Sequence, residues 1–233
     1  MSKELETFLK KLDVKPNDIA IFENAFVHRS ALNEKTASSE SNEKLEFLGD
    51  AVLELLMTDY LYKKVFRKEG ELSAIRAAAV KTPTLASVSQ KMRLGQFLLL
   101  SKGEELTGGR EKEGILADIF EAFLGAVYLD QGLEKAGQIF KIYLLPYLKD
   151  IIKNKKYIDP KTYLQEVIQE KWQTLPKYEV AKEEGPDHNK NFTVEVLLED
   201  KVLGSGSGFS KQGAEEEAAR NALHKLEKRN ENK

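Results

Sequence analysis

The sequence predicts two modules of different class, an all-α module followed by a small α+β module. Over residues 1–150 the apolar residues recur every three or four positions, which is the spacing of helices that bury one face. After residue 158 the pattern changes to a helix, three alternating segments and a second helix. The chain has 233 residues, of which 41% are hydrophobic, so it is long enough for one large domain or two smaller ones.

The first module is predicted to consist of eight helices. Polar residues and glycines interrupt the helical pattern over 33–41, at Gly70 and over 107–109. The expected helices cover residues 3–12, 17–29, 42–65, 71–80, 83–93, 95–101, 112–130 and 132–150. The lysine-rich stretch over 151–158 offers few apolar anchors, and we expect it to be a linker.

The second module is predicted over residues 159–229 with the order α-β-β-β-α. Asp159 followed by Pro160 is typical of a helix start, and TYLQEVIQEKW continues the helix. The segments KYEVAKEE, FTVEVLLED and KVLGSGSGFS read as strands, the third weakened by its glycines. The last helix begins near Lys211 and places one apolar stripe on a single face: Ala214, Ala218, Ala222 and Leu226.

Composition excludes several classes of protein. With no cysteine and three histidines, the chain has no disulfide framework, iron–sulfur cluster or thiolate zinc site. The net charge of −2 gives no basic excess that would by itself point to nucleic acid. The longest apolar run, 123–129, is far below the roughly 18 residues of a membrane span, and the first residues lack a signal-peptide core. We therefore expect a cytoplasmic protein with no membrane partner.

Two predicted helices carry acidic pairs among apolar residues. Glu46 and Asp50 stand one turn apart in LEFLGDAVLELL, with Glu43 one turn before them, and Asp118 and Glu121 do so in ILADIFEAFLGAVYL. Like charges at this spacing repel by a few tenths of a kcal/mol, and an uncompensated buried carboxylate costs several more. If the two helices pack side by side, four carboxylates converge on one place.

Two other interpretations of these carboxylates stay open. Each pair could lie on a solvated face, or could be neutralised by arginines such as Arg76 and Arg110. If the carboxylates do converge, they form a site with oxygen donors alone, which suits Mg²⁺ or Mn²⁺ rather than zinc or copper. Carboxylate-held Mg²⁺ most often serves phosphate chemistry, so the residues point to metal-dependent phosphoryl hydrolysis.

One long motif resembles a known family. ESNEKLEFLGDAVLELL, residues 40–56, is similar to the signature of bacterial ribonuclease III. Further segments agree with that family in the same order: HRSALNE, EGELSAIRAA, the KGEE and TGGR loop, ILADIFEAFLGAVYLDQG, and a C-terminal module resembling a double-stranded-RNA-binding domain. The resemblance covers nearly the whole chain.

The resemblance implies an all-α endonuclease domain followed by a double-stranded-RNA-binding domain. It implies a homodimer that cleaves double-stranded RNA by Mg²⁺-dependent hydrolysis, without a small-molecule cofactor. The products would carry 5′-phosphates, 3′-hydroxyls and short 3′ overhangs, and the substrates would be structured precursors such as ribosomal RNA. Against this stands a catalytically silent protein that binds double-stranded RNA, or, more remotely, a helical metal-binding scaffold.

The resemblance also assigns residues to roles. The metal-binding catalytic carboxylates would be Glu46, Asp50, Asp118 and Glu121. Supporting roles around the cleavage site and the subunit contact would fall to Glu43 and Glu69, with Glu71 as a competitor for the latter. The RNA contacts would be made by Gln165, Glu166, His188, Lys190, Ser210 and Lys211. His28 is expected to be structural.

The last helix departs from the family pattern. Members usually carry two or three basic residues in succession at its start, whereas this chain has Lys211, then Gln212 and Gly213, and soon afterwards three glutamates. The departure predicts a modest affinity for phosphates, with Lys190 or Arg220 compensating.

Overall fold

The chain folds into two compact units, with the boundary between Tyr157 and Ile158. The structure is a computed structural model that describes residues 3–33, 40–186 and 190–231, with the backbone alone over 227–231. In the part of the chain that the structure describes, no helix is long and apolar enough to span a membrane. Each unit has its own hydrophobic core, as the change of sequence pattern predicts.

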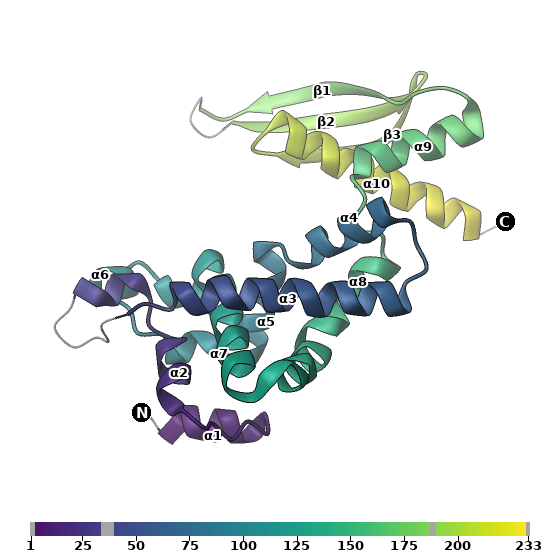
Figure 1. Cartoon of the computed structure of the whole chain (residues 1–233). Helices are drawn as coiled ribbons and strands as arrows, with labels where there is room; N and C mark the ends of the chain where they lie inside the picture. The colour runs from purple at the N-terminus through teal and green to yellow at the C-terminus, as the bar shows by residue number, and fades with distance from the viewer. Residues whose placement is uncertain (1–2, 34–39, 187–189, 232–233) are drawn as a thin grey trace. The chain divides into compact units, whose positions relative to one another are not determined.

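The first unit is helical, apart from a single β-bridge between Val27 and Leu99 among its described residues. Figure 1 shows α3 crossing the middle of this unit, with α7 packed along it. Its α-helices are α1 (Lys3–Lys11), α2 (Ile19–Asn24), α3 (Glu43–Lys64), α4 (Glu69–Ala79), α5 (Thr82–Met92), α6 (Lys102–Leu106), α7 (Glu113–Ile139) and α8 (Leu145–Lys153). The shorter turns are η1 (Arg29–Asn33), η2 (Leu94–Phe97), η3 (Gly109–Glu111) and the π-helical η4 (Phe140–Leu144).

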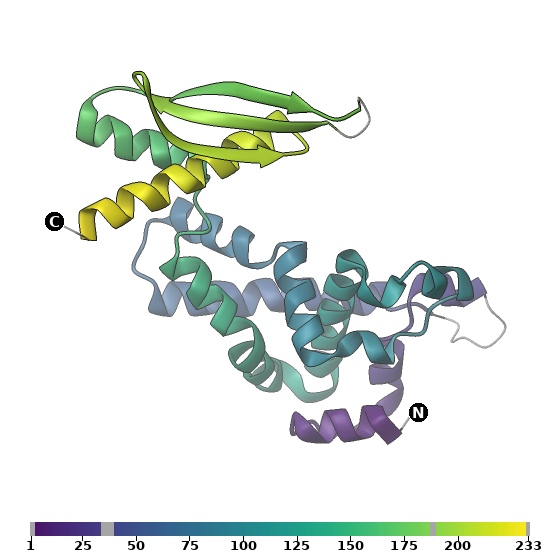
Figure 2. The same ribbon diagram turned by 180° about the vertical axis from the view of Figure 1, so that it is seen from behind.

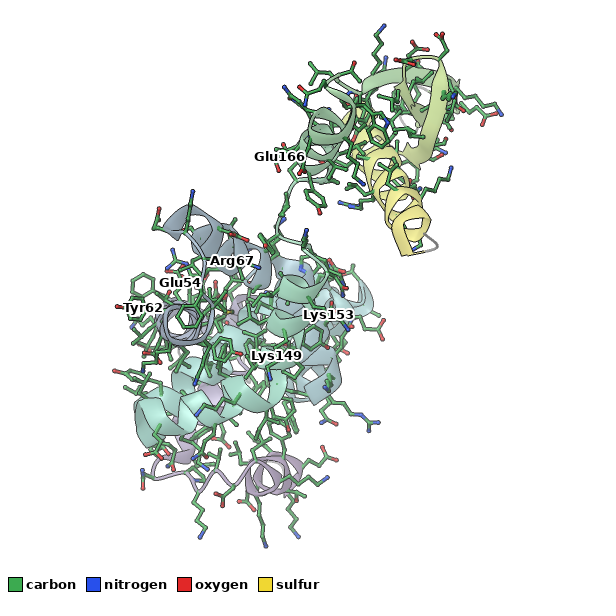
Figure 3. All side chains as sticks on the ribbon, turned by 90° about the vertical axis from the view of Figure 1, so that its right-hand side faces the viewer. Glu54, Tyr62, Arg67, Lys149, Lys153 and Glu166 are labelled. Atoms are coloured by element: carbon green, nitrogen blue, oxygen red, sulfur yellow. The ribbon has the colours of Figure 1, made fainter. Side chains whose placement is uncertain are left out.

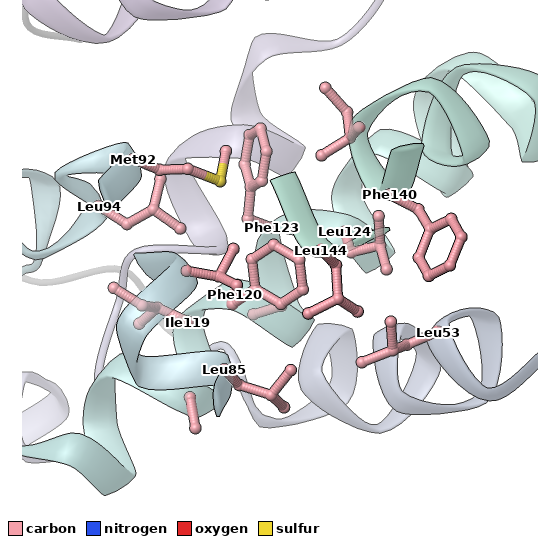
Figure 4. Close-up of a cluster of buried hydrophobic side chains, with 14 of the residues drawn as sticks. Leu53, Leu85, Met92, Leu94, Ile119, Phe120, Phe123, Leu124, Phe140 and Leu144 are labelled. Carbon is pink, nitrogen blue, oxygen red and sulfur yellow. The ribbon is translucent and has the colours of Figure 1, made fainter. Parts of the chain in front are cut away.

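The core of this unit is built around α7. From 115 to 127 almost every side chain of α7 is buried, and Asp118 and Glu121 are the half-buried exceptions. Figure 4 shows Phe120 and Phe123 of this helix within the buried cluster, together with Leu53 of α3. Because the rest of this part of α7 is buried among apolar side chains, its two acids share the one side of the helix that is only partly covered.

Two details of the helical prediction are wrong. The expected helix over 95–101 ends at Phe97 as η2, because the next residues run extended and Leu99 exchanges backbone hydrogen bonds with Phe26 and His28. The expected break at Gly70 lies instead before Glu69, so Gly70 sits inside α4. The break expected near residue 131 is found, because the backbone of α7 is kinked at Gly132, whose φ of 82° is not helical.

The expected linker over 151–158 is too long at its N-terminal end. Helix α8 continues to Lys153, and Ile151 is buried in the core of the first unit. Tyr157 packs against the same core, and its hydroxyl donates to a carboxylate oxygen of Glu71 at 2.5 Å. These anchors are apolar and aromatic residues scattered among lysines, so the lysine-rich composition concealed them.

The second unit has the predicted order, α9 (Pro160–Trp172), β1 (Lys177–Glu184), β2 (Asn191–Leu198), β3 (Lys201–Gly208) and α10 (Lys211–Glu231). The three strands form one antiparallel sheet in the order β1-β2-β3, and Figure 2 shows both helices on the same face of it. Asp159 caps α9 as predicted, because its carboxylate accepts from the backbone N–H of Thr162 at 2.8 Å.

The apolar stripe predicted on the last helix is confirmed. Its members are buried against the sheet: Ala214, Ala218, Ala222 and Leu226. Glycines in β3 make this contact close, since a β-carbon at Gly206 would lie 2.2 Å from the backbone nitrogen of Ala218. The glycines that weaken β3 as a strand therefore allow the helix backbone to approach the sheet.

Candidate functional site

The two acidic helices cross at a pair of glycines. A β-carbon at Gly49 of α3 would lie 1.8 Å from the carbonyl oxygen of Glu121 in α7, and one at Gly125 would lie 2.3 Å from the carbonyl oxygen of Leu45. The two backbones are thus in direct contact, which no side chain at either position would permit. Gly49 immediately precedes Asp50, so the crossing point is also the point where the two acidic pairs meet.

The carboxylates at this crossing affect one another electrostatically. Burial raises the pKa of Glu121 to about 8, and the negative charges of Asp50, Glu46 and Asp118 contribute to that rise in that order. Burial, followed by the charges of Asp118 and Glu43, raises the pKa of Glu46. Within one chain, the acids of α3 are therefore close enough to those of α7 for their charges to act on Glu121 and Glu46.

The third half-buried acid, Asp118, is influenced by two potentially positive side chains. Burial raises its pKa, and the charges of His28 and Arg29 act against that rise. The alternative that arginines neutralise the acids is wrong for both candidates. Arg76 donates to the hydroxyl of Thr58, and Arg110 pairs with Glu105 and donates to backbone carbonyls.

The donor chemistry of this crossing fits a hard cation. Four carboxylates supply oxygen atoms alone, and a divalent ion would offset the repulsion that raises the pKa of Glu121 and Glu46. Within the described residues, no three acidic or histidine side chains already form a finished ligand set. Because like charges repel, an ion would have to draw the carboxylate oxygen atoms together.

An acidic pocket of about 790 Å³ opens beside the crossing. Glu46 and Asp118 line it from α3 and α7, whereas Asp50 and Glu121 are not among its lining residues. The pocket also contains two acids and three basic or potentially basic side chains: Glu43, Glu104, His28, Arg29 and Lys112. The pocket therefore combines carboxylate oxygens of the kind that hard cations prefer with cationic groups of the kind that attract phosphate.

His28 was expected to be structural, and the structure instead places it at the acidic pocket. Its Nδ1 lies 2.8 Å from the hydroxyl oxygen of Ser30, which accepts a hydrogen bond from the backbone N–H of Ser101 at 3.0 Å. Burial lowers the pKa of His28 despite the nearby charges of Glu104 and Asp118. The spacing of acids in the sequence does not predict this position, because His28 lies in the segment between α2 and η1 and not on either acidic helix.

The two supporting acids occupy different places. Glu43 lines the acidic pocket, accepts from the hydroxyl of Ser41 at 2.8 Å and lies 3.9 Å from a guanidinium nitrogen of Arg29. Glu69 begins α4 beyond the far end of α3, accepts from the hydroxyl of Ser73 at 3.1 Å, and lines a separate pocket of about 580 Å³. Within one chain, Glu69 is not brought to the four carboxylates.

The predicted RNA contacts of the second unit are spread over α9 and the start of α10. Gln165 and Glu166 are exposed on α9, and Figure 3 shows Glu166 on the side that faces away from the sheet. Ser210 caps α10, because its hydroxyl oxygen accepts from the backbone N–H of Gly213 at 3.1 Å. His188 lies outside the described residues. Lys190, the first described residue after that gap, is half-buried.

Lys211 is held rather than extended freely. Its ammonium lies 2.9 Å from a carboxylate oxygen of Glu183 at the end of β1 and 5.4 Å from the ring centre of Phe192. An ammonium over an aromatic face is attracted by it. Lys211 is also the first residue of α10, and the N-terminus of a helix attracts anions.

The glutamates that follow Lys211 are engaged within the unit. Glu215 pairs with Lys161, Glu216 with Arg220, and the carboxylate of Glu217 accepts from the backbone N–H of Ser207 at 2.6 Å. Their charge is thus partly neutralised by internal partners, and Arg220, expected to compensate for the missing lysines, is itself one of those partners.

The comparisons with known proteins agree with this geometry. The Ribonuclease-III-like family matches residues 18–148, and the double-stranded RNA binding motif matches residues 160–226. Proteins named Ribonuclease 3 are similar to this chain: that of Pelotomaculum thermopropionicum is 46% identical and that of Bacillus licheniformis 43%. The matches cover 94% and 97% of this chain and 92% of each relative.

Solved structures match the first unit. Two structures of the nuclease domain of ribonuclease III from Campylobacter jejuni are 38% and 37% identical, each with a TM-score of 0.56. They cover 61% and 63% of this chain and 96% and 97% of their own chains. The helical unit with its paired acids, the α-β-β-β-α unit and these matches over nearly the full length agree: the chain belongs to the ribonuclease III family, the endonucleases of double-stranded RNA.

Proposed function

We propose that the protein hydrolyses phosphodiester bonds of double-stranded RNA with Mg²⁺, or Mn²⁺ in its place, held by Glu46, Asp50, Asp118 and Glu121. The observation that carries this proposal is the glycine crossing of α3 and α7, which puts the acids of the two helices close enough for their charges to raise the pKa of Glu121 and of Glu46. Such an arrangement is costly without a cation and suits one well.

The chemistry divides between the ion and the chain. When bound, Mg²⁺ activates a water molecule and stabilises the leaving oxygen, which gives a 5′-phosphate and a 3′-hydroxyl. Glu46 and Asp118 present their oxygens to the acidic pocket, and Arg29 and Lys112 bring positive charge there for the phosphate of the substrate. Glu43 holds Arg29 at that pocket, which is the supporting role that we propose for it.

A homodimer is part of the proposal. Apolar side chains lie exposed along α3 and just beyond it, with Phe47 82%, Tyr62 82% and Phe66 94% exposed. Figure 3, which views α3 end-on, shows Tyr62 on its outer side. One of the Campylobacter jejuni structures is described as flexible in the region involved in dimer formation of its nuclease domain. A second copy covering this face would bury these rings, and Glu69, which lines a pocket together with Tyr62, would then serve at the subunit contact.

Two active sites in such a dimer would cut both strands of one duplex and leave short 3′ overhangs. We propose structured precursors such as ribosomal RNA as substrates, and the second unit as the part that binds them by their A-form shape. The residues proposed to contact RNA there are Gln165, Glu166, His188, Lys190, Ser210 and Lys211. The cytoplasmic location predicted from the sequence is retained as part of this proposal, since transcripts are processed where they are made.

The decisive experiment offers the protein labelled duplex RNA, single-stranded RNA and duplex DNA, each with Mg²⁺ or with EDTA. Cleavage of duplex RNA in Mg²⁺ alone, with 5′-phosphates on the products, supports the proposal. Binding of duplex RNA without cleavage in Mg²⁺ or Mn²⁺ would instead identify the catalytically silent binding protein.

A further inference from the structure

A third pocket of the first unit, of about 590 Å³, lies apart from the acidic one. It is bounded by α1, by the end of α5 and by η2, and it shares no lining residue with the acidic pocket. One face of α1 supplies Lys3, Thr7 and Lys11, which follow each other at intervals of four residues and so lie in one row. Figure 1 shows α1 at the margin of this unit, and the two lysines of the row, Lys3 and Lys11, are exposed to solvent.

The lining of this pocket is strongly basic, although the chain as a whole has a net charge of −2. Four cationic side chains line it, Lys3, Lys11, Lys91 and Arg93, against one acid, Glu4. In the described part of the chain none of the four cations forms an ion pair, and Lys91 lies 6.0 Å from the ring centre of Tyr147. The pocket therefore presents positive charge that the protein itself does not neutralise.

Aromatic rings form the apolar part of the same lining. Phe8 and Phe97 are half-buried, and their ring centres lie 5.1 Å apart at a tilt of 44°. Tyr143, also half-buried, lines the pocket from η4. Phe97 is fixed from behind by Phe26, at 5.3 Å between ring centres. The rings are thus rigidly supported and partly open to the pocket, as a stacking surface requires.

From this combination we infer that the α1–η2 pocket binds unpaired nucleotides of RNA, with phosphates on its cations and a base on its aromatic rings. Cations that follow a backbone and rings that stack bases are the two features by which proteins bind single strands without sequence preference. The pocket volume lies in the range of roughly 300–1,000 Å³ that suits a small ligand, so it accepts one or two nucleotides rather than a duplex.

The inference extends the proposed function, on which it rests for the choice of RNA as ligand. Structured precursors carry single strands next to their duplexes, and the α1–η2 pocket would hold such a flank while the acidic pocket acts on the duplex. An acidic peptide would satisfy the cations but would leave the paired rings without a planar partner. The aromatic rings therefore favour RNA.

The test measures binding of a fluorescein-labelled hexamer of uridylate to the full-length protein in EDTA, by anisotropy over a range of salt concentrations. The pocket variant combines Lys11→Gln, Lys91→Gln and Arg93→Gly. Arg93 has a φ of 57°, a left-handed conformation that glycine adopts without strain, so Arg93→Gly removes the charge without disturbing the turn. The matched control combines Lys10→Gln, Lys149→Gln and Lys153→Gln, three exposed lysines that do not line the pocket.

The pocket variant is expected to bind the hexamer about ten-fold more weakly, and its slope of log affinity against log salt should fall by about 2, since three cations are lost. The control variant should stay within about two-fold of the unchanged protein. A Phe8→Leu variant, which keeps the apolar contact but removes the ring, should bind about five-fold more weakly. Equal losses in pocket and control variants would overturn the inference, because they would show general electrostatics.

A positional measurement completes the test. Photo-crosslinking of 4-thiouridine RNA should label peptides that contain residues 3–12 or 91–97, and labels confined to other peptides would contradict the inference. Displacement of the hexamer by poly-glutamate, but not by 5′-AMP at the same charge concentration, would assign the pocket to acidic peptides and reject RNA. Cleavage of a blunt-ended duplex in Mg²⁺ should be unchanged in the pocket variant. If the unchanged protein does not cut the duplex at all, the proposed function is wrong, whereas the inference about the α1–η2 pocket is judged by the binding and crosslinking results.

Discussion

Gly49 and Glu121 approach so closely that a β-carbon on the first would lie 1.8 Å from the carbonyl oxygen of the second. The contact joins two helices that are far apart in the chain and sets the distance between their acids. Substitution of the glycine therefore tests both the core and the site.

We predict that Gly49→Ala destabilises the first unit by about 3 kcal/mol or more, because the added methyl group forces two backbones apart. The measurement is denaturant unfolding of the full chain. Gly70→Ala is the matched control: Gly70 is also helical, but a β-carbon there meets nothing within 4 Å. That substitution should stabilise the protein by up to about 1 kcal/mol. Similar effects of the two substitutions would refute the glycine crossing.

Replacement of Glu121 by glutamine should abolish cleavage in Mg²⁺ while duplex RNA still binds with nearly unchanged affinity. The amide keeps the size of the side chain but loses the negative charge that a cation requires. Gel assays of cutting and anisotropy assays of binding separate the two effects. The proposed mechanism is wrong if this variant cuts at the rate of the unchanged protein.

The same variant should also change how stability depends on pH. The pKa of Glu121 is raised from 4.5 to about 8 in the folded protein. Between these pH values the folded protein holds a proton that the unfolded chain has released, so the free energy of unfolding falls as the pH rises. Glutamine has no such proton to lose.

In EDTA, the melting temperature of Glu121→Gln should therefore exceed that of the unchanged protein by a margin that grows from pH 5.5 to pH 8.5. Addition of Mg²⁺ at pH 8.5 should stabilise the unchanged protein more than the variant, and so reverse the order. A margin that is constant over this pH range would show that the acids do not repel one another as described.

In the second unit, Lys211→Gln should weaken binding of duplex RNA and lower the slope of log affinity against log salt by about 1, the signature of one lost phosphate contact. Glu183→Gln should strengthen binding by about two- to fivefold, since it frees the ammonium of Lys211 from a weak, exposed ion pair. If both substitutions leave the slope unchanged, Lys211 does not meet a phosphate.

Truncation tests the domain boundary. A fragment ending at Tyr157 should fold and cut duplex RNA at low salt, with weaker binding at physiological salt, because the four acids of the candidate site all lie in the first unit. A fragment ending at residue 150 should melt at a lower temperature, since it lacks buried Ile151 and the Tyr157–Glu71 hydrogen bond. Equal melting temperatures of the two fragments would show that residues 151–157 do not stabilise the first unit and belong to the linker.

Much of the local structure could be predicted because it depends on neighbours in the chain. The helix of residues 43–64 and the strand of residues 177–184 follow from apolar spacing and are found within one or two residues of their expected ends. Errors arose where distant contacts decide the backbone, as in the bridge between Val27 and Leu99. The kink at Gly132, by contrast, falls where the sequence predicts a break between two helices.

The candidate site divides in the same way. The sequence by itself determined which chemistry is available: oxygen donors in two apolar helices, with no thiolate and few imidazoles, and a second module of alternating strands. It determined these because residue type and spacing are local properties. Only the tertiary structure decided that the acids meet at the crossing of Gly49 and Gly125, that His28 lies beside them, and that Glu69 does not. Those facts depend on how closely two backbones can approach across the fold, and that distance is set by packing rather than by spacing along the chain.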